Sequence, residues 1–346
     1  MSSSLNVGDF HNFGKRVEYR IDPKGHPAFF KPRTLYWEYQ FLCANSELRR
    51  SLVQYLGHDC LAPLGNIGFF SDDGFQSGYM EPVEECLEQD KRSFESFAEV
   101  AAIATAFGMV DLHFTNCLIT HSSRFGILDI ECPFFLCESV AETALVGRRN
   151  LPFERSGIAR LSPLLATNPD APEIAKLVIT HYKALDQLGQ FASQIRQVLQ
   201  NLPVNQVTIR ILMRSTRDYR NHEPGSEPFF DEERIQLERG DIPYFFKFPG
   251  NDTAFFYNTP SSFKAIKEVP SIFKNVVERS GASFLALFAT ERLLRIKAQS
   301  ALLLAHRALS MAKLNTAICD EIDIRLDSER LVLDLGSQKI EAHIKG

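Results

Sequence analysis

Two short polar segments carry the residue types that phosphoryl transfer needs. In the first, Asp111-Leu-His-Phe-Thr-Asn116, an aspartate and an asparagine stand five positions apart. In the second, Asp129 and Glu131 follow the apolar run 125–128. In phosphoryl transfer from ATP, a first aspartate accepts the proton of the attacking hydroxyl, and an asparagine and a second acidic residue hold Mg²⁺ on the phosphates. Because magnesium prefers hard oxygen ligands, we expect Asp111 to be the base and Asn116, Asp129 and Glu131 to bind the metal.

A lysine and a glycine-bounded segment precede these residues. Lys31 ends the apolar run 28–30, as the phosphate-binding lysine of a kinase ends its strand. The segment Gly8-Asp-Phe-His-Asn-Phe-Gly14 comes before it, where a loop that covers a nucleotide would lie. His113 stands between the predicted base and a predicted metal ligand, so we expect it to shape that loop or to assist catalysis. Each pattern alone also fits a solvated loop or a capped turn, but their common order favours a nucleotide site.

Alternating and helical patterns predict an α+β chain that positions these residues. Residues up to about 90 are strand-rich, with strands predicted at 17–21, 28–30, 67–70 and 78–82 and a helix over 38–55. Helical spacing predicts further helices over 94–109, 171–201, 283–296 and 297–314. Short apolar runs predict strands at 116–119, 125–130 and 207–211, and the alternation from 322 to 335 predicts a terminal hairpin.

Composition narrows the class of protein. The chain has 346 residues, of which 45% are hydrophobic and 23% charged, which excludes disorder and indicates about two domains. The net charge of -5 gives no basic field for nucleic acid. Seven cysteines without a CxxC pair give neither a disulfide framework nor a zinc-ligand pattern. No signal segment or membrane-length apolar run is present, so we expect a cytoplasmic protein without membrane or nucleic-acid partners.

These motifs together resemble a known family. The segments around Asp111, Asn116 and Asp129, preceded by Gly8-Asp-Phe-His11 and Lys31-Pro-Arg-Thr-Leu35, are similar to the dehydratase domain of class II lanthipeptide synthetases, the LanM type. Two later segments extend the similarity: 210–219 has the form R-x-x-x-R-x-T-x-x-Y, and 240–245 reads GDIPYF. Ordinary small-molecule kinases share the DLHxxN element but not these two, so the later segments carry most of the discrimination.

The resemblance implies a fold and a two-step reaction. The fold is a bilobal, protein-kinase-like one with an N-lobe over 1–85 and an elaborated helical C-lobe over 86–346. With ATP and Mg²⁺, the enzyme phosphorylates Ser or Thr of a ribosomally made precursor peptide and then eliminates phosphate, which gives dehydroalanine or dehydrobutyrine. Three sets of residues match the family: Lys31, Asp111, His113, Asn116 and Asp129 for phosphorylation; Asp9 and His11 for the loop over the nucleotide; and Arg210 and Thr216 for elimination.

The elimination step makes chemical sense for these side chains. Departing phosphate needs cationic donors on its oxygens, and an arginine fork supplies them, so we also assign Arg214, four positions after Arg210, to the catalytic set. The alternative is a solvated basic face in which these arginines pair with acidic neighbours such as Asp218.

The chain also departs from the full-length enzymes of this family. It lacks their large leading region and their zinc cyclase domain, so we expect a stand-alone dehydratase, as in proteusin-type pathways, that recognises leader and core of its peptide alone or with partner enzymes of the pathway. Two alternatives stay open: a plain ATP-dependent phosphotransferase that stops at the phosphoester, and a non-catalytic peptide-binding scaffold.

Overall fold

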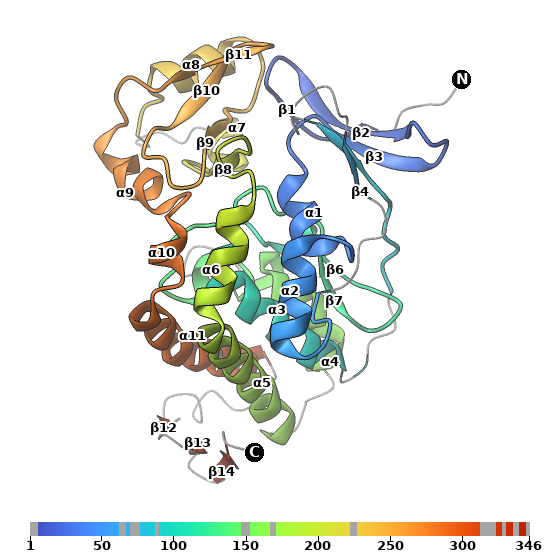
Figure 1. Ribbon diagram of the computed structural model, residues 1–346, viewed down its shortest axis with the longest axis vertical. Helices are drawn as coiled ribbons and strands as arrows, with labels where there is room; N and C mark the ends of the chain where they lie inside the picture. Colours follow the sequence, from blue (N-terminus) through green and yellow to red (C-terminus); the bar gives the residue numbers. More distant parts are fainter. Residues whose placement is uncertain are drawn as a thin grey trace.

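The computed structural model combines helices with antiparallel sheets, which confirms the predicted α+β class (Figure 1). The structure describes residues 6–61, 67–69, 77–86, 90, 92–146, 153–166, 171–221, 227–311, 323–326, 330–334 and 339–343. The lobe boundary predicted after residue 85 stays a prediction. One apolar core includes residues on both sides of that boundary: Trp37 packs edge-on against Phe134, with ring centroids 4.6 Å apart.

A five-stranded sheet comes first in the chain and ends at Lys31 on its third strand. Its order is β1-β2-β3-β5-β4. The strands are β1 (Asn6–His11), β2 (Lys15–Ile21), β3 (Pro27–Lys31), β4 (Ile67–Phe69) and β5 (Gly78–Met80). The predicted pairing of 67–70 with 78–82 is confirmed by β4 and β5. The predicted loop between Gly8 and Gly14 is mostly wrong, because the strand β1 continues to His11 and only 12–14 form the turn.

Two helices lie between β3 and β4 in the chain, where one was predicted. They are α1 (Tyr36–Leu42) and α2 (Glu47–Leu56). The helix is interrupted before Ser46. The Ser46 hydroxyl accepts a hydrogen bond from the Arg49 amide at 3.2 Å and donates one to the Gln40 carbonyl at 2.6 Å. A serine that caps the next helix in this way satisfies amides that would otherwise be unpaired. The helical spacing of apolar residues over 38–55 therefore spans two helices rather than one.

A helical layer forms the largest part of the core. It contains α3 (Arg92–Ala106), α4 (Ser162–Ala166), α5 (Ala171–Gln190), α6 (Ala192–Asn201), α10 (Phe284–Leu287) and α11 (Thr290–Met311). Short 3₁₀ helices lie at Phe114–Asn116, Val140–Thr143, Phe153–Arg155 and Gly157–Leu161. The single helix predicted over 171–201 is wrong, because it is interrupted at Phe191, two residues after Gly189. The predicted break near 297 is also wrong, since α11 is continuous there.

Two small β-structures complete the strands around this layer. The hairpin β6 (Cys117–Ile119) and β7 (Phe125–Ile127) follows the DLHxxN segment, as predicted. The predicted terminal hairpin is instead a three-stranded sheet of β12 (Asp323–Leu326), β13 (Arg330–Asp334) and β14 (Lys339–His343). Part of the predicted hairpin range, including residues 322 and 335, lies outside the described residues.

A second sheet packs beside the first at the same end of the molecule (Figure 1). Its order is β11-β10-β9-β8, and its strands are β8 (Ile209–Ile211), β9 (Phe245–Lys247), β10 (Phe255–Thr259) and β11 (Ser262–Ala265). Helices α7 (Thr216–Arg220), α8 (Asp231–Glu238) and α9 (Ser271–Arg279) accompany it. It has a separate small core that includes Phe245, Phe256 and Phe273.

The described helices give no membrane-crossing segment: none of them is both long enough and apolar enough to span a bilayer.

Candidate functional site

A buried ion cluster forms where β3, α1 and the segment after β7 meet. The Lys31 ammonium lies 3.6 Å from an Asp129 carboxylate oxygen and 3.9 Å from Glu38 Oε1, and it donates a hydrogen bond to the Leu128 carbonyl at 3.2 Å. Glu38 is fully buried on α1. Burial opposes ionisation of Asp129, yet the charges of Arg33 and Lys31 lower the pKa of its carboxyl to about 2. The lysine and the aspartate predicted for phosphoryl transfer are therefore in direct contact.

Arginines extend this cluster toward the second sheet. Arg33 Nη2 contacts Asp129 and lies 2.5 Å from Glu38 Oε1, while its Nε lies 3.1 Å from Glu131 Oε2. The other oxygen of Glu131 lies 2.5 Å from Arg210 Nη1 on β8. Glu131, predicted as a metal ligand, thus has both carboxylate oxygens in ion pairs and joins the phosphoryl-transfer residues to the arginine predicted for elimination.

The predicted catalytic loop is a tight turn before β6. Asp111 has a left-handed backbone (φ 68°), an unfavourable conformation that is often found at functional sites. The Asn116 side chain donates to the Asp111 carbonyl at 2.9 Å, and His113 Nε2 lies 3.7 Å from Asp111 Oδ1. Burial lowers the pKa of His113, and the charge of Arg155 lowers it further, against the opposing effect of Asp129. The Leu128 amide donates to the Asn116 carbonyl at 2.9 Å, so this loop is held beside the ion cluster.

The first hairpin is fastened to the GDIPYF segment. The Phe13 and Gly14 amides donate to the two carboxylate oxygens of buried Asp241, at 2.7 and 2.8 Å. His11 Nδ1 donates to the Ile242 carbonyl at 2.8 Å, which leaves Nε2 as the acceptor of the neutral ring. Burial lowers the pKa of His11, and so does the charge of Arg210, so these two side chains share one environment. The GDIPYF segment therefore holds the predicted nucleotide-covering residues in place.

The remaining predicted residues lie around this centre. Asp9 pairs with Arg220, and Gly8 lies beside it on β1. Arg214 pairs with buried Glu233 at 2.9 Å, whereas Arg210 pairs with Glu131. Thr216 is the first residue of α7, directly after the capping serine of that helix, and is half-buried.

A cavity of about 380 Å³ opens between the two sheets. Aromatic side chains line it from both sides: Phe30, Phe246, Tyr257 and Phe263. Neighbouring residues of a strand point to opposite faces of its sheet. Because Phe30 lines the cavity, the cavity lies on the face of the first sheet opposite to the Lys31 side chain. Arg33 lines the cavity as well as contacting Asp129, and therefore connects the cavity with the ion cluster.

The donor set fits a magnesium–nucleotide group. Asn116 uses its Nδ2 in the loop, which leaves Oδ1 as an oxygen ligand, and the loop is bonded to Leu128, the residue before Asp129. Two of the buried atoms that have no hydrogen-bond partner among the described residues belong to this cluster: Glu38 Oε2 and Arg210 Nε. An orphaned acceptor and an orphaned donor within one charged cluster are what a polar ligand would satisfy. Asn116 and Asp129 would hold the metal, and Lys31 would contact the phosphates.

Sequence reasoning missed two members of this cluster. Glu38 is the one charged residue of the mostly aromatic helix Tyr36-Trp-Glu-Tyr-Gln-Phe-Leu42, and a lone charge in such a helix is a signal for a buried functional carboxylate. Arg33 lies in the quoted KPRTL segment without an assigned role, although it contacts three carboxylates. A scan against protein-family models finds no match to this chain, and a search of curated proteins finds none either.

Proposed function

We propose that the chain is a peptide Ser/Thr dehydratase with a bilobal, kinase-like fold, which phosphorylates a precursor peptide from ATP and then eliminates the phosphate. The observation that carries the proposal is the continuous ion network from Lys31 through Asp129, Arg33 and Glu131 to Arg210. This network supports the proposal because it joins Lys31 and Asp129 to Arg210, whose buried Nε has no hydrogen-bond partner among the described residues. Both half-reactions need such cations on phosphate oxygens.

In the first step, Asp111 accepts the proton of the substrate hydroxyl, whose oxygen forms a bond to the γ-phosphorus while the bond to ADP breaks. Lys31 holds the phosphates, and the buried pairing with Glu38 keeps its ammonium in position. Bound Mg²⁺ supplies charge neutralisation on the transferred group. The low pKa of Asp129 keeps its carboxylate ionised at neutral pH, as a metal ligand must be.

In the second step, a base removes the Cα proton and the Cβ–O bond to phosphate breaks, which leaves the alkene and inorganic phosphate. Arg210 presents its free Nε–H to the departing oxygen, and Glu131 raises the pKa of this guanidinium against the effect of burial, so it stays charged. His11 and His113 are the candidate bases, because burial lowers the pKa of both and a neutral imidazole can accept a proton. The aromatic cavity, which lies across the first sheet from Lys31, offers apolar contacts for residues of the peptide, leader or core, that are distant from the reacting side chain.

The second candidate is a phosphotransferase that stops at the phosphoester. The pairing of Arg214 with Glu233 rather than with Glu131 favours it, because it leaves one arginine instead of two at the elimination step. A third candidate, the scaffold, needs none of the buried charges around Lys31, which are costly to retain without a catalytic use.

Intact mass spectrometry separates these candidates. The purified chain is incubated with ATP, Mg²⁺ and the precursor peptide encoded beside it, with or without partner enzymes of the pathway. A loss of about 18 Da per site indicates dehydration, whereas a gain of about 80 Da indicates a phosphoester as final product. Unchanged peptide, together with no binding of ATP, supports the scaffold and contradicts the proposal.

Variants then assign the two half-reactions. Asp129→Asn is expected to abolish both mass changes, because the side chain that binds the metal and pairs with Lys31 loses its charge. Arg210→Ala is expected to accumulate the phosphorylated peptide, with Arg210→Lys as a milder variant that keeps the charge near Glu131. Arg214→Ala is the matched arginine control and, from its pairing with Glu233, is expected to affect elimination less than Arg210→Ala does. Full dehydration by Arg210→Ala would overturn the assignment.

A further inference from the structure

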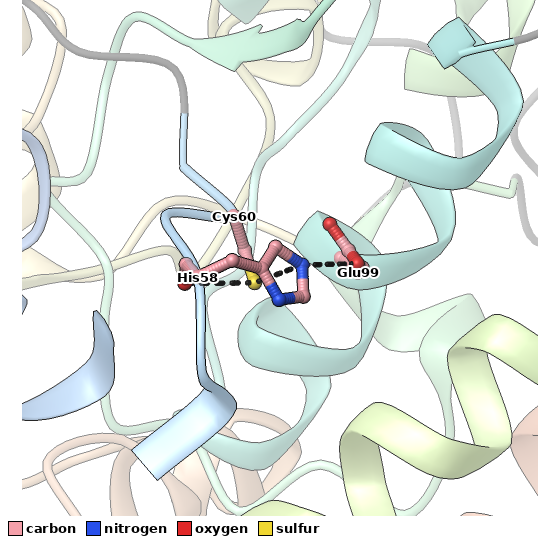
Figure 2. A group of neighbouring side chains, drawn as sticks. All are labelled: His58, Cys60 and Glu99. Carbon is pink, nitrogen blue, oxygen red and sulfur yellow. Dashed lines mark hydrogen bonds and ion pairs between the residues drawn. The ribbon is translucent and has the colours of Figure 1, made fainter. Parts of the chain in front are cut away.

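Three potential metal ligands meet outside the site described above. His58 and Cys60 lie in the loop after α2, and Glu99 lies on α3, with the imidazole of His58 between the other two side chains (Figure 2). His58 Nε2 is 2.7 Å from Glu99 Oε1 and 3.5 Å from Cys60 Sγ. One ligand atom from each residue lies within 4.8 Å of the others. Gly57 makes this possible, because its left-handed backbone (φ 80°) ends α2 and turns the chain toward α3.

The positions of the protons call for a cation at this point. His58 Nδ1 lies 3.1 Å from the Leu56 carbonyl and Nε2 lies 2.7 Å from Glu99 Oε1, so both ring nitrogens face groups that accept hydrogen bonds. A neutral imidazole has one N–H and satisfies one of these contacts, so a second cation, either a proton or a metal ion, is needed at the ring. At 2.7 Å a proton fits between Nε2 and Oε1, whereas a zinc ion bound to both atoms holds them about 3.3 Å apart, so Glu99 has to move back by about 0.6 Å when the metal binds.

The third ligand adds a thiol to the site, and its distance from His58 Nε2 is compatible with zinc. Zinc binds sulfur at about 2.3 Å and imidazole nitrogen at about 2.0–2.1 Å, and a tetrahedral angle between them sets the S···N separation near 3.5 Å. Cys60 Sγ and His58 Nε2 are separated by that distance. Metal-binding histidines usually donate their other N–H to a carbonyl or carboxylate, as Nδ1 does here to Leu56. A set of nitrogen, sulfur and oxygen donors suits zinc rather than magnesium.

We propose that His58, Cys60 and Glu99 bind one Zn²⁺ ion, independently of the nucleotide site. On binding, the thiol proton of Cys60 is released to solvent and the thiolate coordinates the metal. The fourth position faces a cavity of about 390 Å³ whose lining includes all three ligands as well as Lys183, Asp186 and Gln187. Water or an anionic group fits there. The ion joins the loop after α2 to α3, across the predicted lobe boundary.

Metal binding to the full chain tests this directly. The protein is treated with a chelator, dialysed, and titrated with Zn²⁺ against a chromophoric competitor. One equivalent is expected to bind, and Cys60→Ser and His58→Gln are each expected to weaken it at least about tenfold. Cys43→Ser and His121→Gln are the controls, because they remove a partly exposed thiol and an exposed histidine from other places, and they are expected to bind Zn²⁺ as the unchanged chain does.

Cobalt substitution makes the test independent of whether a variant folds. Co²⁺ bound to the unchanged chain is expected to show a thiolate-to-metal charge-transfer band and tetrahedral ligand-field bands, which report a sulfur ligand without any mutation. If no equivalent binds, if the charge-transfer band is missing, or if Cys60→Ser binds Zn²⁺ undiminished, then the proton alone bridges His58 and Glu99 and the metal site does not exist.

Discussion

Glu38 illustrates how much a single charge can matter when it is fully buried. Its Oε1 lies close to Lys31, Arg33 and the Ile130 amide, while Oε2 has no partner among the described residues. Replacement by glutamine keeps the shape but removes the charge. Because a kinase-like lysine must be paired with a glutamate to hold phosphates, we expect Glu38→Gln to reduce phosphorylation about tenfold or more, measured as the initial rate of peptide mass increase.

The control for this variant is Glu47→Gln, the same change on an exposed residue of α2. It is expected to leave the rate unchanged, since exposed charges are well screened. Equal rates for Glu38→Gln and the unchanged chain would show that the buried pair is structural and would remove Glu38 from the site.

At the level of elements, the first hairpin is hydrogen-bonded to the carboxylate of Asp241, which lies in the segment between α8 and β9. Asp241 accepts hydrogen bonds from the amides of Phe13 and Gly14 and pairs with Arg239. In Asp241→Asn one of the two acceptor atoms becomes a donor, so one of these amides is left unpaired. We expect amide hydrogen exchange in a peptide spanning 10–16 to become at least about tenfold faster, which corresponds to the loss of about 1–3 kcal/mol of local protection.

Asp22→Asn is the matched control, because Asp22 accepts from the amides of Lys24 and His26 in the exposed turn at the opposite end of β2. Both of these amides donate to Oδ1, which asparagine keeps as an acceptor, so this variant is expected to retain the turn and to leave exchange at 10–16 unchanged. Unaltered exchange at 10–16 in Asp241→Asn would mean that the pairing of β1 with β2 and the hydrogen bonds of Ile242 with Phe10 and His11 hold the hairpin without this carboxylate.

Gly108 places the end of α3 against the segment that leads to the second sheet. Its φ of 61° is left-handed, and a Cβ there would lie 1.8 Å from the Phe135 carbonyl oxygen. We expect Gly108→Ala to lower the free energy of unfolding by about 3 kcal/mol or more, since both the backbone strain and a collision with main chain oppose it. Chemical denaturation measures the change.

Gly250→Ala separates the two contributions. Gly250 is also left-handed (φ 77°), but nothing lies within 4 Å of a Cβ built there. The strain alone should cost about 1–2 kcal/mol. If both variants lose the same stability, the close approach of Phe135 does not contribute.

Across the whole molecule, elements formed by residues that are close in the sequence could be predicted, whereas contacts between distant segments of the chain could not. Residues that act together within one turn, such as Asp111 and Asn116, are near neighbours in the sequence, and the strand patterns of the first sheet were readable for the same reason. No strand or helix was predicted between 212 and 282, because β9 is only three residues long and buried throughout, so it shows no alternation. The contact of Gly14 with Asp241 spans 227 positions, and a single sequence carries no sign of it.

The stability of the whole helical layer should depend on pH through His181. This residue lies on α5, is fully buried against α3, and donates from Nδ1 to the Ala98 carbonyl at 3.1 Å. Burial lowers its pKa to about 4, although the hydrogen bond to Ala98 raises it slightly. In the unfolded chain the pKa returns to about 6.5, so between pH 6.5 and 4 the unfolded state binds more protons than the folded one. The free energy of unfolding therefore falls as the pH is lowered through this range, by about 3 kcal/mol in total.

His181→Asn isolates this contribution, because an asparagine amide can keep the bond to Ala98 but does not titrate. Urea unfolding at intervals from pH 7 to 4 is expected to show a shallower loss of stability for this variant than for the unchanged chain. His26→Asn, which removes an exposed histidine, is expected to follow the unchanged chain. Parallel curves for His181→Asn and the unchanged chain would place the acid sensitivity elsewhere. The paired carboxylates are the other candidates, and Asp129, with its pKa of about 2, would act only at lower pH.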